Sequence, residues 1–414
     1  MKPDTRAVPG SLWRDRDFLI FWCAQTLSVA GDSFALIAVP LLVLNVTGSV
    51  AQMGLLTGVS GAASVAAGIL AGALADRFDR RRLLIACDVI RLVLFATIPV
   101  VWAFGDHVWL LFCVLPLAAA VGMVFQVTYV TAVRELAGET RVTEANGMLY
   151  ATAAAAGILG PSLAGVVSSN LGPTAAITIN AASFGLSALG VLLTRSSRYA
   201  VEAAPAPRGR PLRELLAGAE FLVRHPVLRT LTILLSFFIF MTLGLTDIVI
   251  YRLKHDLGQA DSVVGVVLGV GAAGTMIGSM LVARVRRSLG FGPSWIGAQV
   301  VSGLAILGLG LAGSVWGVAA IMALYLACVS VAGICSMSLR QQVTPAHLLG
   351  RVTSAFWTIH FSLGPVGAAA LGWAAASYGA TAVFVIAGAS CLLLALVALA
   401  TPVRQRHPER APAT

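Results

Sequence analysis

The sequence predicts an all-α integral membrane protein, with twelve transmembrane helices arranged as two pseudo-symmetric six-helix bundles. Hydrophobic residues make up 58% of its 414 residues and charged residues only 11%, whereas soluble domains carry roughly 25% charged residues. A helix in lipid satisfies its own backbone hydrogen bonds and presents apolar side chains outward. The composition therefore indicates a chain that crosses a bilayer repeatedly.

Twelve apolar runs provide the predicted spans, because each crossing needs about 20 apolar residues. Charged residues or clusters of Gly and Pro separate the runs. The first six lie at about 18–44, 51–74, 83–104, 107–132, 146–168 and 174–193. The second six lie at about 228–251, 262–283, 292–312, 316–338, 352–376 and 381–402.

The longest break between these runs divides the chain into two halves. It is basic, includes the stretch APAPRGRP, and predicts a cytoplasmic linker with a short amphipathic helix around Leu212–Val223. The predicted parts are an N-terminal bundle (1–193), the linker (194–226), a C-terminal bundle (227–403) and a cytoplasmic tail (404–414). Related six-span halves are typical of transporters that alternate access to a site at the membrane midplane.

The positive charges predict the orientation of the chain. With the N-terminus in the cytoplasm, 25 of the 28 lysines and arginines fall in cytoplasmic segments, as the positive-inside rule requires. Only Arg252 and Lys254 face outward, and Arg91 lies within span 3. Both termini are therefore expected in the cytoplasm, and the net charge of +10 reflects orientation rather than a nucleic-acid partner.

Motifs for metal, disulfide and nucleotide chemistry are missing from the sequence. The six cysteines stand singly within apolar runs and form no CxxC or Cys/His cluster, so neither a zinc site nor a disulfide framework is expected. No GxxxxGK[ST] loop is present, which excludes ATP as the energy source. We expect no cofactor, no metal and no enzymatic activity, because no nucleophile and base pair is visible.

The sharpest motif is Gly72-Ala-Leu-Ala-Asp76-Arg77-Phe-Asp-Arg80-Arg81-Arg82, between spans 2 and 3. Its small residues allow close packing, and its carboxylate can face the positive N-terminus of another helix. The arginines can pair with carboxylates or lipid phosphates. The motif thus predicts a latch that forms in one arrangement of the bundles and breaks in the other.

This stretch resembles the loop signature of the major facilitator superfamily, and the resemblance extends over the whole chain in its twelve spans, central loop and related halves. Gly31-Asp32, Asp88-x-x-Arg91 and Gly350-Arg351-Val352 resemble the drug:proton antiporter branch, with its macrolide-efflux and enterobactin-exporter proteins. The resemblance implies a monomer in a bacterial cytoplasmic membrane. It also implies that Asp76 holds the outward-facing state by contacting the cytoplasmic end of span 11.

Span 5 resembles the antiporter motif of this superfamily, with alanine at two of the glycine positions. The residues that match are Gly147, Gly160, Pro161 and Gly165. Small residues and a proline give a bendable helix with a smooth contact face, although ordinary close packing explains them as well. Span 4 carries Gln126 but lacks the Arg-x-x-Gln-Gly of many proton antiporters, so that route of proton coupling is not supported.

Carboxylates at lipid depth are costly, roughly 2.5–3.5 kcal/mol on insertion scales, and are functional candidates by default. Asp32 lies near the middle of span 1 and is the first candidate for proton coupling. Asp247 lies near the outer end of span 7 and is a candidate second proton site or gate partner of Arg252, with a solvated position at the membrane interface as the alternative. Asp88 and Arg91 share one helical face, which favours a structural ion pair.

Spans 1, 4, 7 and 10 surround the cavity in the superfamily, and the resemblance implies that their aromatic, sulfur-containing and polar residues line it. The candidates are Gln25, Gln126, Tyr129, Phe237, Phe240, Met241, Ser336 and Met337. Such a cavity is apolar with few polar anchors and suits amphipathic substrates of varied chemistry. Any single aromatic or methionine side chain among them more often packs against another helix than contacts a ligand.

The function expected from these features is export of a small amphipathic compound, such as a drug, antibiotic or siderophore-like molecule, in exchange for protons. The alternative on the same fold is a proton symporter for uptake. A third hypothesis, from another class, is a receptor or scaffold that does not transport. The sequence does not identify the substrate.

Overall fold

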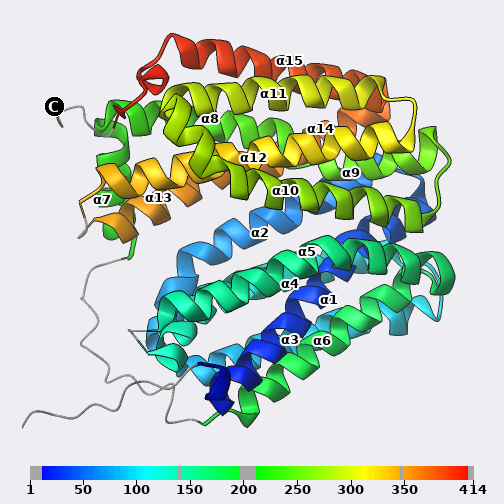
Figure 1. Ribbon diagram of the computed structural model, residues 1–414. Helices are drawn as coiled ribbons and strands as arrows, with labels where there is room; N and C mark the ends of the chain where they lie inside the picture. Colours follow the sequence, from blue (N-terminus) through cyan, green and yellow to red (C-terminus); the bar gives the residue numbers. More distant parts are fainter. Residues whose placement is uncertain (1–11, 139–140, 196–210, 346–347, 409–414) are drawn as a thin grey trace, which may run out of the picture.

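The computed structural model describes residues 12–138, 141–195, 211–345 and 348–408, and these residues form helices joined by short turns (Figure 1). Twelve helical segments within them are long and apolar enough to cross a membrane. The predicted all-α fold with twelve spans is therefore confirmed. The linker residues 196–210 and parts of both termini lie outside the described residues.

The first bundle consists of six single helices, one for each predicted span. They are α1 (Arg16–Thr47), α2 (Val50–Arg77), α3 (Arg80–Trp102), α4 (Val108–Ala137), α5 (Val142–Leu171) and α6 (Pro173–Leu193). Polar caps set several of the starts: the side chain of Asp15 accepts from the Phe18 amide at α1, and Ser49 accepts from the Gln52 amide at α2.

The second bundle also has six spans, but two of them are interrupted. Its helices are α8 (Pro226–Thr242), α9 (Leu245–Tyr251), α10 (Asp261–Leu289), α11 (Phe291–Leu311), α12 (Val315–Val343), α13 (Leu349–Ser362), α14 (Gly364–Tyr378) and α15 (Ala380–Leu399). Span 7 breaks between α8 and α9 beside Gly244, and span 11 breaks before Gly364-Pro365. The expected single runs over 228–251 and 352–376 are thus each two helices, because glycine and proline weaken the helix there.

A fifteenth helix, α7 (Pro211–Arg224), lies in the linker region and packs against α13. It is strongly amphipathic, as expected for residues around Leu212–Val223. A Cβ on Gly218 would collide with the backbone of Arg351, so the absence of a side chain permits the close approach. The linker is therefore attached to the second bundle at this point.

The two bundles touch at one end of the molecule and diverge toward the other (Figure 1). At one face α1 begins, and the last described residues follow α15. We call this the terminal face, and we call the opposite face the far face. In the half near the far face, α2 packs on α14 and α5 packs on α10. A Cβ on Gly54 would lie 2.5 Å from the Ala368 carbonyl oxygen. Small residues thus close the far face.

Candidate transport site

Two cavities meet beside α1, one extending toward the far face and one lying within the first bundle. Asp32, Arg91 and Gly122 line both of them. The first has a volume of about 490 Å³ and reaches the second bundle at Leu243, Thr246 and Asp247. The second has a volume of about 580 Å³. Together they surround the polar groups that the two cavities share, the carboxylate of Asp32 and the guanidinium of Arg91.

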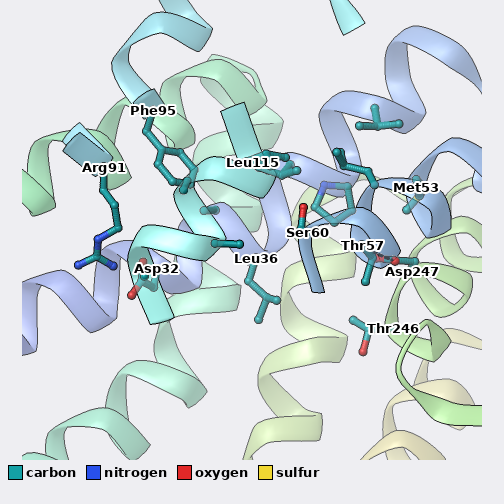
Figure 2. Close-up of a pocket in the computed structure, with 18 of the residues that line it drawn as sticks. Asp32, Leu36, Met53, Thr57, Ser60, Arg91, Phe95, Leu115, Thr246 and Asp247 are labelled. Carbon is teal, nitrogen blue, oxygen red and sulfur yellow. Dashed lines mark hydrogen bonds between the residues drawn. The ribbon is translucent and has the colours of Figure 1, made fainter. Parts of the chain in front are cut away.

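Most of the first cavity is lined by apolar side chains (Figure 2). These include Ala35, Leu36, Val39, Val43, Met53, Leu56, Phe95, Leu115 and Phe184. The second cavity is more polar, with amides and hydroxyls from α1, α4 and α5. These include Gln25, Thr26, Ser28, Gln126, Tyr129, Asn146, Tyr150 and Thr152. An amphipathic molecule can therefore place its apolar body in the first cavity and its polar part in the second.

Asp32 is exposed to both cavities and has no hydrogen-bond or ion-pair partner among the described residues. The preceding residue explains its orientation. A Cβ on Gly31 would collide with the Ser183 side chain, so glycine allows α1 to pack directly on α6. With Gly31 facing α6, the next side chain along the helix faces the cavity. Asp32 therefore lines both cavities, and its role in proton coupling stays a prediction.

Asp88 and Arg91 form the ion pair expected from their spacing, with 2.5 Å between Arg91 Nη2 and Asp88 Oδ1. Both side chains are almost fully buried. The guanidinium lies 4.5 Å from the Phe125 ring centroid and 4.0 Å from that of Phe184. Such contacts stabilise a cation that has lost its water. Unlike a purely structural pair, Arg91 also lines both cavities.

Asp247 lies on α9 and is bonded across the seam between the bundles. The Thr57 hydroxyl of α2 donates to Asp247 Oδ2 at 2.6 Å (Figure 2). Arg252 does not pair with Asp247 in this conformation; it donates to Thr381 Oγ1 at 2.9 Å and to the Ala312 carbonyl at 3.0 Å. The carboxylate therefore joins the bundles near the far face.

Replacing Thr57 with valine keeps the side-chain shape and removes the hydroxyl that crosses the seam. We expect closure of the far face to weaken by about 1 kcal/mol, the net contribution of such a bond. Double electron–electron resonance between spin labels at Asn45 and Ala260 should then show a larger population of long distances. Thr97→Val is the control, because its hydroxyl donates only within its own helix, to the Leu94 carbonyl. An unchanged distribution would contradict a role for the bond in closure.

The small residues of span 5 pack against both bundles. Gly160 faces the Ser33 side chain of α1, and the Pro161 carbonyl faces Gly265 of α10. A Cβ on Gly165 would lie 2.6 Å from the Asp261 carbonyl oxygen and 2.9 Å from Gly265 Cα. Nearer the terminal face, a Cβ on Gly147 would meet no atom within 4 Å. Of the motif residues, Pro161 and Gly165 thus belong to the seam with α10 that closes the far face.

The latch predicted after span 2 is only partly described. The side chain of Asp76 and the surroundings of Gly72 lie outside the described residues, and Arg77 is exposed. Arg80 pairs with Glu135 of α4, and Arg81 donates to the Val191 and Leu192 carbonyls of α6. These two arginines join helices of the first bundle and do not bridge the two bundles.

Of the residues predicted to line the cavity, those of the first bundle do so and those of the second bundle do not. Gln25, Gln126 and Tyr129 line the second cavity, and Gln25 also donates to Ser187 Oγ at 3.0 Å. The five candidates of the second bundle line neither cavity: Phe237, Phe240, Met241, Ser336 and Met337. Ser336 is buried, and the sulfur of Met337 contacts Arg340. The second bundle instead contributes Leu243, Thr246 and Asp247, next to the break in span 7.

Sequence reasoning missed several residues of the first cavity, above all Thr57 and Phe184. Both belong to spans that were not expected to face the cavity. Thr57 carries no charge or motif, and Phe184 resembles any other apolar residue of span 6. Only helix packing places them beside Asp247 and Arg91. The sequence alone therefore gives no indication that Thr57 and Phe184 line the cavity.

Among the described residues, no group of three or more His, Cys, Asp or Glu side chains is positioned to hold a metal ion. The ionisable groups that face the cavities are Asp32, Arg91, Tyr129, Tyr150 and Asp247. This arrangement can exchange protons and bind charged groups.

Comparisons with known proteins identify relatives that are membrane transporters. The sequence profile of the Major Facilitator Superfamily matches residues 21–366. The multidrug efflux pump Tap of Mycobacterium tuberculosis is 25% identical over 407 residues, which cover 93% of each chain. The enterobactin exporter EntS of Escherichia coli is 25% identical over 407 residues, which cover 95% of this chain and 94% of that one.

Solved structures show the same fold at lower identity. The nucleoside transporter NupG has a TM-score of 0.76 and 13% identity, with 93% of this chain and 98% of that one covered. A bacterial homologue of the lysosomal transporter Spinster, in an inward-facing and unoccupied conformation, has a TM-score of 0.73 and 15% identity, with 95% and 96% covered. Identities this low show a likeness of fold alone.

Proposed function

Because this chain belongs to the major facilitator superfamily, whose profile matches it over residues 21–366, we propose that it exports a small amphipathic compound in exchange for protons. Its family and its twelve spans make it a multi-pass membrane transporter and not an enzyme. The direction of transport and the coupling ion are the parts that we propose.

One observation carries the proposal: the carboxylate of Asp32, which has no partner among the described residues, lies where an apolar cavity and a polar cavity meet. An exchanger needs a group that holds either a proton or substrate, and a carboxylate without a fixed partner meets that need. The names of Tap and EntS, both exporters, favour the outward direction. NupG shares only the fold and does not argue for uptake.

The membrane potential is sufficient to drive such an exchange. It supplies about 2.3 kcal/mol per charge per 100 mV, so one proton supports a useful substrate gradient. In the proposed cycle, Asp32 takes up a proton while the site faces outward and releases it to the cytoplasm when the bundles are arranged as in Figure 1. Asp247 serves as a second proton site, and its bond to Thr57 forms when the far face closes.

The chain is proposed to lie in a bacterial cytoplasmic membrane as a monomer, with the terminal face toward the cytoplasm. The clustered arginines favour this orientation by the positive-inside rule. Reporter fusions after Arg82 and within the 196–210 linker should both report a cytoplasmic location. Fusions that report opposite sides would overturn the orientation.

Everted membrane vesicles test the direction and the coupling together. Susceptibility profiling of a deletion strain first supplies a transported compound. An exporter should accumulate that compound in the vesicle lumen when the lumen is acidified, and addition of a protonophore should abolish the accumulation. A symporter for uptake would instead empty the lumen under the same gradient. A receptor or scaffold would show neither movement, so each of these two outcomes would refute the proposal.

A further inference from the structure

Arg340, in the last turn of α12, is a cation buried inside the second bundle. Only 1% of its surface is exposed, so the side chain does not reach water at the membrane surface. Its Nη2 donates to Met337 Sδ at 3.1 Å, whereas Nε and Nη1 have no partner among the described residues. A buried charge without a counter-ion is costly, and at lipid depth it marks a functional candidate by default.

The surrounding sequence supplies no counter-ion for Arg340. Between Asp261 and Glu409 the chain contains no aspartate or glutamate, so spans 9 to 12 are without carboxylates. Of the described carboxylates that precede this stretch in the second half of the chain, Glu220 pairs with Arg224 on α7, and the others lie near the far face. The negative charge that balances Arg340 must therefore come from outside these spans.

Two aromatic side chains of α13 cover the guanidinium of Arg340. Its Cζ lies 3.5 Å from the Phe356 ring centroid and 5.7 Å from that of Trp357. Ring faces hold a desolvated cation but do not occupy its N–H groups. Ser336, one turn earlier on α12, likewise has a buried hydroxyl without a partner in the described part of the chain. The position therefore retains hydrogen-bond donors for an anionic group.

Trp357 contacts Arg340 and also lines a third cavity, which lies between the bundles and has a volume of about 530 Å³. The α2 and α4 helices line one side of it, and α13 and α14 line the other. Its described lining is mostly apolar and contains no charged side chain. This cavity adjoins the first one, because Leu243 lines both and the neighbouring residues Ser60 and Gly61 line one each. An apolar space thus leads from Trp357 toward the transport site.

We propose that Arg340 binds the carboxylate of a lipophilic substrate, whose apolar body occupies the third cavity, once the Trp357 side chain turns aside. This inference rests on the proposed export function and adds the chemical class of the substrate. The planar guanidinium matches a carboxylate in shape and charge. The bound carboxylate supplies the counter-ion that spans 9 to 12 do not contain.

A negatively charged substrate also suits exchange for protons. The cytoplasm is electrically negative relative to the outside, so an anion that leaves and a proton that enters both move in the direction that the membrane potential favours. In this scheme Asp32 carries the proton in the first bundle, and Arg340 holds the charged end of the substrate in the second.

Binding of 1-pyrenebutyrate to purified protein in phosphatidylcholine nanodiscs tests the inference, with the neutral 1-pyrenebutanol as the matched ligand. After subtraction of the signal from empty nanodiscs, the wild type should bind the carboxylate at least about tenfold more tightly than the alcohol. Arg340→Gln should remove this preference and leave the affinity for the alcohol unchanged. Arg286→Gln is the control, since this arginine also lies over a ring, 5.9 Å from the Phe291 centroid, but is outside the third cavity. It should keep the wild-type preference.

A purely structural role for Arg340 makes different predictions. Arg340→Gln would then lose affinity for both ligands equally, and that result would overturn the inference. Removal of a buried cation without a counter-ion should instead stabilise the protein, so Arg340→Met should melt about 2–4 °C above the wild type in the absence of ligand. A lower melting temperature would show that the cation stabilises the unliganded protein, and it would count against the inference.

Trp357→Ala tests the path to the site. Association of 1-pyrenebutyrate, followed by stopped-flow fluorescence, should be severalfold faster in this variant, because the indole no longer covers the guanidinium. Phe361→Ala is the control, since Phe361 lines the same cavity at a position one turn further along α13; its association rate should match that of the wild type. An unchanged rate in the Trp357 variant would contradict entry past this side chain.

Nanodiscs that contain phosphatidylglycerol distinguish a substrate from a lipid headgroup. At high salt, which screens the surface charge of the lipid, the affinity for 1-pyrenebutyrate should be unchanged in them. Loss of binding would assign Arg340 to an anionic lipid and overturn the substrate class. Equal affinities of the wild type for the carboxylate and the alcohol would overturn it as well. Proton-driven export of another compound in everted vesicles would still support the proposed function.

Discussion

Asp32→Asn is expected to abolish proton-driven accumulation in everted vesicles, lowering it by more than about tenfold to the level of vesicles without the transporter. Asparagine matches aspartate in shape but does not take up or release a proton. Since the side chain faces a cavity and contacts no fixed partner among the described residues, the variant should fold and insert normally. It should also retain slow movement of the compound down its own gradient.

The control for this experiment is Asp106→Asn, the same chemical change at an exposed position between α3 and α4. Its accumulation should equal that of the wild type. Full proton-driven accumulation by the Asp32 variant would refute the assignment of Asp32 to proton coupling. Equal loss in both variants would show that the change acts through folding or insertion, and it would also count against the assignment.

Gly165→Ala is expected to have the second large effect, because α5 and α10 touch through their backbones at this point. The new Cβ would lie 2.6 Å from the Asp261 carbonyl oxygen, which does not move without the helix. Overpacking of this kind costs about 2 kcal/mol, which corresponds to roughly a thirtyfold shift of the equilibrium away from closure of the far face. Transport should fall strongly, since the cycle needs the closed arrangement.

Double electron–electron resonance between spin labels at Asn170 and Ala260 measures this separation directly. Both positions are exposed and lie near the far face, one in each bundle. Gly147→Ala is the control within the same helix, since a Cβ there meets no atom within 4 Å. An unchanged distance distribution in the Gly165 variant would show that the contact does not limit closure.

The pair Asp88 and Arg91 shows which features of the site the sequence predicts and which it does not. A spacing of three residues on one helix predicts their contact, because successive turns of a helix bring those side chains together. The same spacing does not reveal that Arg91 also lines both cavities beside Asp32. That depends on how far α3 is rotated against α4 and α6, which no local pattern encodes.

The hydrogen bond between Thr57 and Asp247 is a feature of the site that the sequence did not predict. Its partners are 190 residues apart and belong to different bundles. The sequence singled out Asp247 because a carboxylate within an apolar span is energetically costly. It suggested Arg252 as the partner of Asp247, since the two residues are close in the chain. The break between α8 and α9 and the seam with α2 place Asp247 against Thr57 instead.

The sequence by itself determined the twelve spans and the two related halves, and it singled out Asp32 as a carboxylate within an apolar span. Lipid acts on each helix separately, so hydropathy and the cost of a buried charge are properties of short segments. Only the tertiary structure decided which side chains face the cavities and which face other helices. The candidates Phe237, Phe240, Met241, Ser336 and Met337 line neither transport cavity, because the rotation of each helix is set by close packing against its neighbours, and lipid, apolar on every side, does not specify it.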